Sequence, residues 1–300
     1  MRFAILFLFL VGCGPMKVST SIRIGSLNLA NGAGPEYNTP EARAKQADFI
    51  RAHGLDIVGF QEVDYMMRRS GVVNTGAAAT GLKEYETYHT TNDDGTYNPD
   101  LIATGLGGLS CVVFGTSLTF DANNCDVLDG SPCDTSGNAR YGNAIYVRSG
   151  YGGPHSIYVK TVATKKFPHH EGYEQRSLVL TLVVIPDVTQ LVVINTHLTI
   201  EGPDPVTVRR EQLQVLADAA AAWARVGIPV VITGDFNASV AEVADVFYGS
   251  DLTLASPGGP DQIWTSRDIT IRDDGVGEAR RAGASDHEYM PWAELEFEHK

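Results

Sequence analysis

Two strand-length apolar runs, at residues 191–198 and 229–234, constrain the fold of this chain more than any other feature. Both are rich in valine and isoleucine, as expected of central strands that are covered on both faces. Between them, residues 208–226 repeat apolar side chains at the spacing of an amphipathic helix. The order strand, helix, strand predicts a helix that lies over one face of a sheet.

The rest of the chain predicts strands and loops with one further helix. Thr39 followed by Pro40 is typical of a helix start, and Gly54 is typical of its end. Further strands are predicted at residues 21–29, 55–60, 109–120, 143–148, 176–185, 261–266 and 290–297. Because several consecutive strands have no helix between them, two sheets faced by helices fit this order better than one doubly wound parallel sheet.

The N-terminal segment differs from the rest. Arg2 gives one positive charge, residues 3–11 are apolar without interruption, and Gly12 precedes Cys13. The run is shorter than the roughly 20 residues of a membrane-spanning helix, so we interpret it as a cleaved export signal. Its last four residues resemble a bacterial lipoprotein cleavage box, in which the cysteine becomes the lipidated N-terminus. The alternative is a plain signal peptide in which Cys13 is incidental.

We therefore expect three parts: a lipoprotein signal peptide at residues 1–12, an anchor and linker at 13–20, and a single domain at 21–300. No internal repeat or low-complexity tract divides the third part. The exported protein is expected to be a monomer, lipid-anchored through Cys13 to a membrane of the bacterial cell envelope.

Three cysteines remain after removal of the signal. Cys125 and Cys133 bracket a loop rich in glycine, proline and aspartate, and we predict a disulfide between them in an oxidising compartment. Cys111 falls in a strand-like run, where a buried free thiol is expected.

The charge balance bears on the substrate. The net charge of −13 becomes −14 when Arg2 leaves with the signal. Proteins that rely on nonspecific attraction to polyanions usually carry a basic surface. The balance therefore counts against a nuclease without excluding one, because acidic metal ligands contribute to it.

Polar side chains stand where the apolar strands end. Asn28, Glu62, His197 and Asp235 each follow such a run, and Asp286 comes shortly before the last one. Side chains at strand ends can converge at one rim of a sheet, where loops leave room for a ligand. Carboxylate oxygens favour Mg²⁺ or Mn²⁺ over zinc, and a histidine can exchange a proton near neutral pH.

Taken singly, these residues have structural alternatives. Asp235-Phe236-Asn237 is typical of a turn held by side-chain–backbone hydrogen bonds. The alternative role of Asn28 is to cap a loop, and that of His197 is to be a hydrogen-bonded structural residue. Their order along the chain is what distinguishes a site from a series of turns.

That order resembles the endonuclease/exonuclease/phosphatase superfamily, which includes deoxyribonucleases, abasic-site endonucleases, neutral sphingomyelinases and inositol polyphosphate phosphatases. The matching segments are 24–28 (IGSLN), 56–63 (DIVGFQEV), 141–145 (YGNAI), 174–176 (EQR), 193–198 (VINTHL), 234–238 (GDFNA), 261–263 (DQI) and 285–287 (SDH). The resemblance implies a four-layered α/β/β/α sandwich of two mixed, mainly antiparallel sheets flanked by helices. It also implies an Mg²⁺-dependent hydrolase of phosphodiester bonds, with Mn²⁺ as an alternative cofactor.

The resemblance implies a role for each matching residue. Glu62 is the principal metal ligand, with Asn28 and Asp286 beside it. His287 is the general base on the attacking water, and Asp261 orients it. The match at Asp261 is imperfect, because the family usually has an aromatic residue where this chain has Gln262.

The remaining catalytic candidates act on the phosphate. Asp235 and Asn237 position the nucleophile and a phosphate oxygen. His197 either hydrogen-bonds the phosphate in the transition state or protonates the leaving oxygen, and the sequence leaves these two roles open.

Three residues are substrate-binding candidates. Arg176 begins a predicted strand, and its planar guanidinium suits a phosphate, although a surface salt bridge is the alternative. Arg69 stands in an Arg-Ser-Gly step that a related group of family members shares. Asn143 lies in a matching segment. His169 and its neighbours are expected to be solvated rather than a second metal cluster.

Three functions remain open. A lipid or small-molecule phosphodiesterase fits the acidic charge and the membrane tether. An extracytoplasmic nuclease acting on DNA or RNA lacks the interleaved basic and aromatic residues of a dedicated single-strand binder. A catalytically silent binding protein is disfavoured, since no acid or base of the family pattern is missing. The lysine- and arginine-rich segments of the inositol phosphatases are also absent from the sequence.

Overall fold

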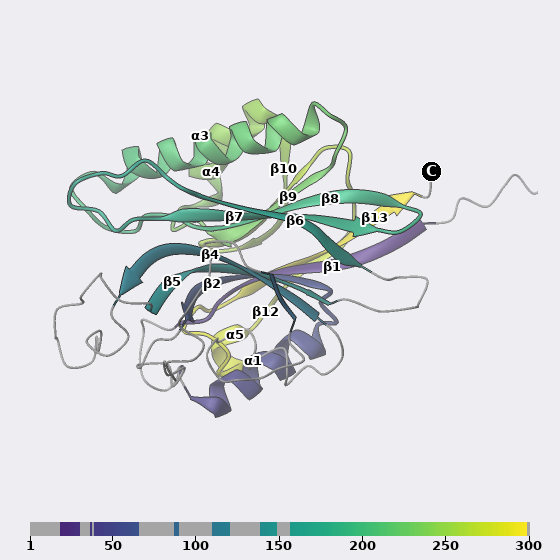
Figure 1. Ribbon diagram of the computed structural model, residues 1–300, viewed down its shortest axis with the longest axis horizontal. Helices are drawn as coiled ribbons and strands as arrows, with labels where there is room; N and C mark the ends of the chain where they lie inside the picture. Colours follow the sequence, from purple (N-terminus) through teal and green to yellow (C-terminus); the bar gives the residue numbers. More distant parts are fainter. Residues whose placement is uncertain are drawn as a thin grey trace, which may run out of the picture.

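The computed structural model describes residues 19–30, 37, 39–65, 87–89, 110–120, 139–148 and 157–298. The predictions for Cys13, Arg69, Cys125 and Cys133 lie outside these ranges, as does that for the side chain of Cys111. Within the described ranges the chain forms two sheets packed face to face, with helices on both outer faces (Figure 1).

The first sheet has seven strands in the described part of the chain, in the order β12-β13-β1-β2-β5-β4-β3. Their bounds are β1 Ser19–Asn28, β2 Ile57–Tyr65, β3 Thr87–His89, β4 Ser110–Phe120, β5 Ala139–Arg148, β12 Thr270–Gly277 and β13 Met290–Glu298. β1 and β2 are parallel, and the other neighbours are antiparallel.

The second sheet has six strands over the same ranges, in the order β10-β11-β9-β8-β7-β6. Their bounds are β6 Tyr158–Lys166, β7 Ser177–Ile185, β8 Thr189–His197, β9 Val230–Asp235, β10 Leu252–Gly258 and β11 Asp261–Ser266. Here β8 and β9 are the parallel pair, joined by helix α3 (Pro205–Ala224), and the other pairs are antiparallel.

Helices complete the four layers. α1 (Pro40–Ala52) and the short α5 (Ala279–Ala282) cover the seven-stranded sheet, while α3 and α4 (Val240–Phe247) cover the six-stranded sheet (Figure 1). A 3₁₀ turn, η3 (Tyr248–Ser250), follows α4. The predicted α/β/β/α sandwich of mixed, mainly antiparallel sheets is confirmed. None of the helices that the structure describes is long and apolar enough to cross a membrane.

Three apolar clusters hold the layers together. The one between the sheets contains Ile24, Ile57, Val193 and Val231, all fully buried. The other two lie between each sheet and its helices. The central strands are therefore covered on both faces, which explains why 191–198 and 229–234 are nearly continuous apolar runs.

Helix boundaries follow from capping. Thr39 Oγ1 accepts a hydrogen bond from Ala42 N at 3.1 Å at the start of α1, as the sequence predicted. α3 begins at Pro205, three residues before the predicted start, because Asp204 Oδ1 accepts from Thr207 N at 3.2 Å. The apolar periodicity marks only the buried stretch of a helix and misses this capped first turn.

The sequence did not predict β3, β6, β10 and β12. Most side chains of β6 and β12 are exposed or half-buried, since these strands form sheet edges. An edge strand lacks the apolar run or strict alternation by which a buried strand is recognised.

Candidate active site

Both parallel strand pairs end at the same rim of the sandwich. Asn28 is the last residue of β1, and Glu62 lies in the neighbouring β2. His197 ends β8 and Asp235 ends β9, where they are paired in register. The site is thus built from two halves, one at the strand ends of each sheet.

The chain turns sharply after these residues, and their own side chains hold the turns. Asn28 Oδ1 accepts from Ala30 N and Asp235 Oδ1 accepts from Asn237 N, each at 2.9 Å. Ala30 and Asn237 have positive φ values of 57° and 47°. The Asp-Phe-Asn segment is therefore both a turn held by a side-chain–backbone hydrogen bond and a part of the site.

Asn28 lies at the centre of the rim. Its Nδ2 is 3.2 Å from Glu62 Oε1, 3.2 Å from Asp235 Oδ2 and 3.4 Å from His287 Nε2. Glu62 has a φ of 55° at an irregularity in the β2–β5 pairing. As arranged, Asn28 offers N–H groups to two carboxylates, and ligation of a cation through Oδ1 requires the amide to turn over.

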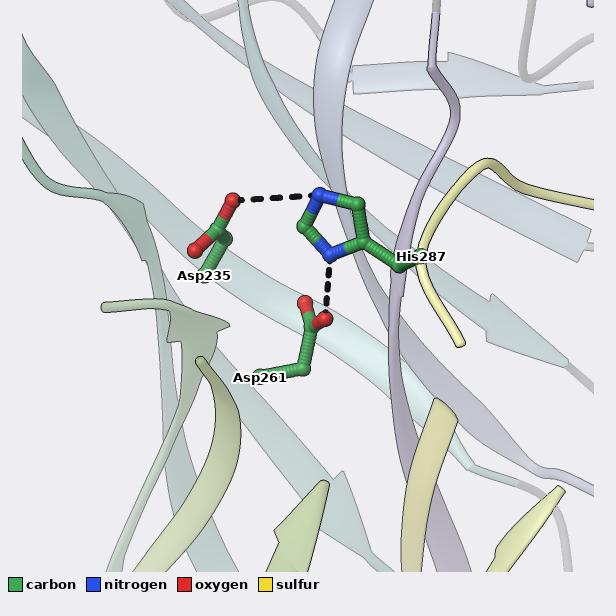
Figure 2. A group of neighbouring side chains, drawn as sticks. All are labelled: Asp235, Asp261 and His287. Carbon is green, nitrogen blue, oxygen red and sulfur yellow. Dashed lines mark hydrogen bonds and ion pairs between the residues drawn. The ribbon is translucent and has the colours of Figure 1, made fainter. Parts of the chain in front are cut away.

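His287 lies between two carboxylates (Figure 2). Its Nδ1 is 2.5 Å from Asp261 Oδ2, and its Nε2 is 3.7 Å from Asp235 Oδ2. Burial alone would lower the pKa of His287, but the hydrogen bond to Asp261 and the nearby carboxylate charges raise it to about 10. Burial raises the pKa of Asp261 to about 7 against the opposing effect of His287. The imidazole is therefore a proton carrier held in place by Asp261.

His197 has the opposite electrostatic environment. Burial, followed by the positive charges of Arg176 and His287, holds its pKa well below the usual 6.5. Its Nε2 is 3.4 Å from Asp235 Oδ2, while the buried Nδ1 has no hydrogen-bond partner. At neutral pH His197 is a neutral imidazole.

The acidic groups at the rim fit a divalent cation. One ligand atom each from Asp235, Asp261 and His287 lie within 4.8 Å of one another. This group differs from the predicted ligand set of Asn28, Glu62 and Asp286. Glu62 nonetheless contacts Asn28, and the charge of Asp286 acts on His287. Oxygen-rich donors of this kind suit Mg²⁺ or Mn²⁺.

Arg176 lies near this rim. It is only 6% exposed, and its Nε and Nη1 make no hydrogen bond. Glu174 Oε1 is 3.3 Å from Nη1, within ion-pair range but without hydrogen-bond geometry. Arg176 lines a hollow of about 320 Å³, together with Glu174, Thr199, Ile200, Glu201 and two glycines. A buried guanidinium with free N–H groups facing a hollow is suited to an anionic ligand.

Asn143 and Asn237 are engaged with the backbone. Asn143 is buried on β5, and its Nδ2 donates to Ser177 O at 2.9 Å. Asn237 Nδ2 donates to Leu198 O at 2.9 Å. Asn237 also lines a hollow of about 590 Å³ with Ile200, Val240 and Pro260. Ile200, which borders both hollows, is 54% exposed and was missed from the sequence. Its place just after His197 was the one available signal.

Gln262 is the departure from the family pattern noted above. Its Nε2 donates to Ala238 O at 2.9 Å and Gly259 O at 3.3 Å, and its Oε1 accepts from Trp264 Nε1. The amide joins the turn that follows β9 to the turn that precedes Asp261, so a hydrogen-bonded residue stands where the family usually has an aromatic one.

His170 contacts Glu211, with Nε2 2.9 Å from Oε2. Among the described residues the rim group is the one cluster with metal-ligand spacing, and it does not include the 169–171 segment. The expectation against a second metal cluster at 169–171 stays a prediction.

Comparison with known proteins agrees with this fold and rim. Residues 25–287 match the model of the Endonuclease/Exonuclease/phosphatase family. The chain belongs to this family, whose members are generally phosphoesterase hydrolases. A comparison with curated proteins found no similar sequence.

Several solved structures share the fold. A family protein from Bacteroides thetaiotaomicron is 16% identical, with 94% of this chain and 96% of that chain covered and a TM-score of 0.59. The human Nocturnin catalytic domain with a bound sulfate is 16% identical, with coverages of 94% and 97% and a TM-score of 0.58. A mannosyl-6-phosphatase from Bacteroides thetaiotaomicron is 16% identical, with coverages of 91% and 99% and a TM-score of 0.57.

Proposed function

We propose that this protein is a divalent-metal-dependent phosphodiesterase that acts on a lipid or small-molecule phosphodiester outside the cytoplasm. The convergence of Asn28, Asp235, Asp261 and His287 within hydrogen-bond distance at one rim carries the proposal. These residues come from sequence positions far apart and from both sheets. Such a set of acids and a histidine serves hydrolysis better than it serves packing.

Glu62 and Asp286, with Asn28 after rotation of its amide, would hold the cation, and Asp235 would position the nucleophile beside it. A divalent cation neutralises the negative charge that grows on the phosphate in the transition state. The rim fits this need, because carboxylates from both sheets gather there: Glu62 Oε1 and Asp235 Oδ2 each lie 3.2 Å from Asn28 Nδ2.

His287 would take the proton from the attacking water. With its pKa raised to about 10 by the surrounding carboxylates, it holds a proton at neutral pH in the metal-free protein. A cation held by Asp286 would offset the charge of one of the carboxylates that raise this pKa. His287 can then act as a base while Asp261 keeps its ring in place.

The surroundings of His197 favour hydrogen bonding of the phosphate over protonation of the leaving oxygen. A general acid must carry a proton to give to the leaving oxygen, but burial and the charge of Arg176 disfavour the protonated form. A neutral imidazole can still donate one N–H to a phosphate oxygen. We therefore assign His197 to hydrogen bonding of the phosphate, beside the free N–H groups of Arg176.

The substrate class rests on charge and location. The net charge, which is −14 once Arg2 leaves with the signal, disfavours a long polyanion, and a lipid anchor at Cys13 would hold the enzyme at a membrane surface. A nuclease is the second candidate, because Arg176 supplies local positive charge at the rim. The name of the mannosyl-6-phosphatase adds phosphomonoesters to the substrates that need testing.

The test compares substrates with one preparation of the protein. Plasmid DNA, RNA, sphingomyelin, bis-p-nitrophenyl phosphate and p-nitrophenyl phosphate are assayed with Mg²⁺ and with chelator. Glu62→Ala is the inactive control, and Glu41→Ala, at an exposed position of α1, is its match. Hydrolysis of the lipid or small diester without nicking of DNA supports the proposal. Nicking abolished by Glu62→Ala makes the protein a nuclease, and silence on all substrates by the folded protein contradicts a phosphoesterase.

The anchor is tested separately. Metabolic labelling with a radioactive fatty acid is expected to label the protein in a bacterial host, and Cys13→Ala is expected to abolish the label. Labelling that survives Cys13→Ala, or no label on the exported protein, contradicts the lipoprotein assignment.

A further inference from the structure

Three strands of the rim carry a buried polar residue two positions before their site residue. The pairs are Ser26 and Asn28 on β1, Asn195 and His197 on β8, and Thr233 and Asp235 on β9. Side chains two residues apart lie on the same face of a strand. These polar residues therefore form a layer below the rim, and each is 0% exposed.

Asn195 is the centre of this layer. Its Oδ1 accepts from Gln61 Nε2 at 2.6 Å and from Thr233 Oγ1 at 3.1 Å. Its Nδ2 donates to Phe60 O at 2.7 Å and Ala144 O at 3.0 Å. Both donors and both acceptor positions of the amide are thus used. Only Thr233 belongs to the same sheet as Asn195, so the other three bonds cross from one sheet to the other.

Gln61 extends the layer on the opposite sheet. Its Nε2 also lies 3.1 Å from Ser26 Oγ, and the next residue is Glu62. The two sheets approach closely here because residue 59 is glycine. A Cβ at Gly59 would lie 2.2 Å from Thr233 Oγ1 and 2.5 Å from Asn195 Oδ1. Any side chain at this position would push against the bonds that join the sheets.

The polar layer lies between the two halves of the candidate site. The predicted metal ligands Asn28, Glu62 and Asp286 belong to the seven-stranded sheet or the loop before β13. His197, Asp235 and Asp261 belong to the six-stranded sheet. Apolar packing between the sheets is non-directional and tolerates sliding, whereas hydrogen bonds have fixed distances and angles.

We propose that Asn195, together with Gln61 and Thr233, is a positioning residue that fixes the spacing between the two halves of the active site. This inference rests on the phosphodiesterase function proposed above. The contact between Asn28 Nδ2 and Asp235 Oδ2, at 3.2 Å, and the contact between His287 and Asp261 both span the two halves. Loss of the layer lets these contacts lengthen without removing any group that touches the substrate.

The test uses Thr233→Val, which removes the bond that orients the Asn195 amide from within its own sheet, and Asn195→Leu, which at similar volume removes all four bonds, including the three that cross between the sheets. Thr233→Ser keeps the hydroxyl and serves as the conservative variant. Thr181→Val is the matched control, because Thr181 is equally buried and its Oγ1 donates to Thr161 O at 3.0 Å within the six-stranded sheet. Turnover of bis-p-nitrophenyl phosphate, Mn²⁺ affinity and the NMR signal of the His287 Nδ1 proton are measured on the folded proteins.

We expect kcat of Thr233→Val to fall about 10-fold and that of Asn195→Leu up to about 100-fold, because small misplacements of reacting groups are costly. KM and Mn²⁺ affinity stay within about twofold, since the predicted ligands share one half of the site. The Nδ1 proton signal shifts as the contact with Asp261 lengthens. Thr233→Ser restores kcat, and Thr181→Val leaves kcat and the signal unchanged.

Unchanged kcat and an unshifted Nδ1 signal in Thr233→Val would overturn the proposal, as would equal losses in Thr181→Val. If Asn195→Leu does not fold, Thr233→Val and Thr233→Ser decide. If the wild-type protein itself lacks turnover, the proposed function fails, and the Nδ1 signal alone still decides whether the layer sets the spacing.

Discussion

Asp261 holds the imidazole of His287 across the gap between the two sheets, with Oδ2 2.5 Å from Nδ1. Asp261 begins β11 in the six-stranded sheet, and His287 precedes β13 in the seven-stranded sheet. The pair thus joins the two halves of the site. It also gives His287 both its orientation and much of its raised pKa.

Asp261→Asn is expected to lower kcat about 100-fold or more, because the amide cannot stabilise the imidazolium and favours another ring tautomer. The pKa of His287 should fall from about 10 toward 6.5, which NMR titration in the presence of chelator measures. Asp251→Asn is the control, at an exposed aspartate with a φ of 58° that asparagine tolerates. An unchanged His287 titration would mean that Asp261 does not set its protonation.

Glu62→Gln is expected to weaken Mg²⁺ binding at least about tenfold and to abolish most turnover, because it removes a negative charge from the predicted cation site. Isothermal titration calorimetry measures the affinity, and chemical denaturation checks that the fold is kept. Glu41→Gln serves as the matched exposed position. Wild-type Mg²⁺ affinity in Glu62→Gln would exclude Glu62 as the principal ligand and favour the Asp235, Asp261 and His287 group instead.

Arg176→Met is expected to weaken binding of inorganic phosphate while making the ligand-free protein more stable. Arg176 is 6% exposed, two of its guanidinium nitrogens make no hydrogen bond, and its ion-pair partner Glu174 is 43% exposed, so the buried charge is poorly compensated and costly to the folded state. We expect a gain of about 1 kcal/mol in the free energy of unfolding and a phosphate Kd at least about fivefold higher. Arg176→Lys, which keeps the charge but not the planar fork, should lie between the two. A loss of stability in Arg176→Met would show that the arginine is structural.

His197 gives the pH dependence of stability a definite sign. Its folded-state pKa lies well below the unfolded value of 6.5, so below pH 6.5 the unfolded state binds a proton that the folded state does not. This contribution is fully present above pH 6.5 and declines by up to about 1.4 kcal/mol per pH unit as the pH falls. Urea unfolding at pH 7.5, 6.5 and 5.5 with chelator should show a steeper decline for the wild-type protein than for His197→Gln. Parallel declines would mean that His197 is protonated in the folded protein.

Local sequence patterns determined much of this protein. The apolar runs at 191–198 and 229–234 specified buried central strands, because burial on both faces favours apolar side chains at nearly every position. Thr39 and Pro40 specified the start of α1 through capping. The order of the strand-end motifs specified the family, and with it the four-layered fold.

Tertiary structure decided how these parts meet. Edge strands β6 and β12 were missed because exposed side chains leave no hydrophobic pattern, and their pairing depends on neighbours far away in the sequence. The role of Asn195 could not be predicted for the same reason, since its four hydrogen bonds connect it to residues 60, 61, 144 and 233. The raised pKa of His287 and the lowered pKa of His197 likewise depend on which charges the fold brings near each ring. The sequence identified both histidines as site residues, but only the packing of the two sheets gives them pKa values shifted in opposite directions.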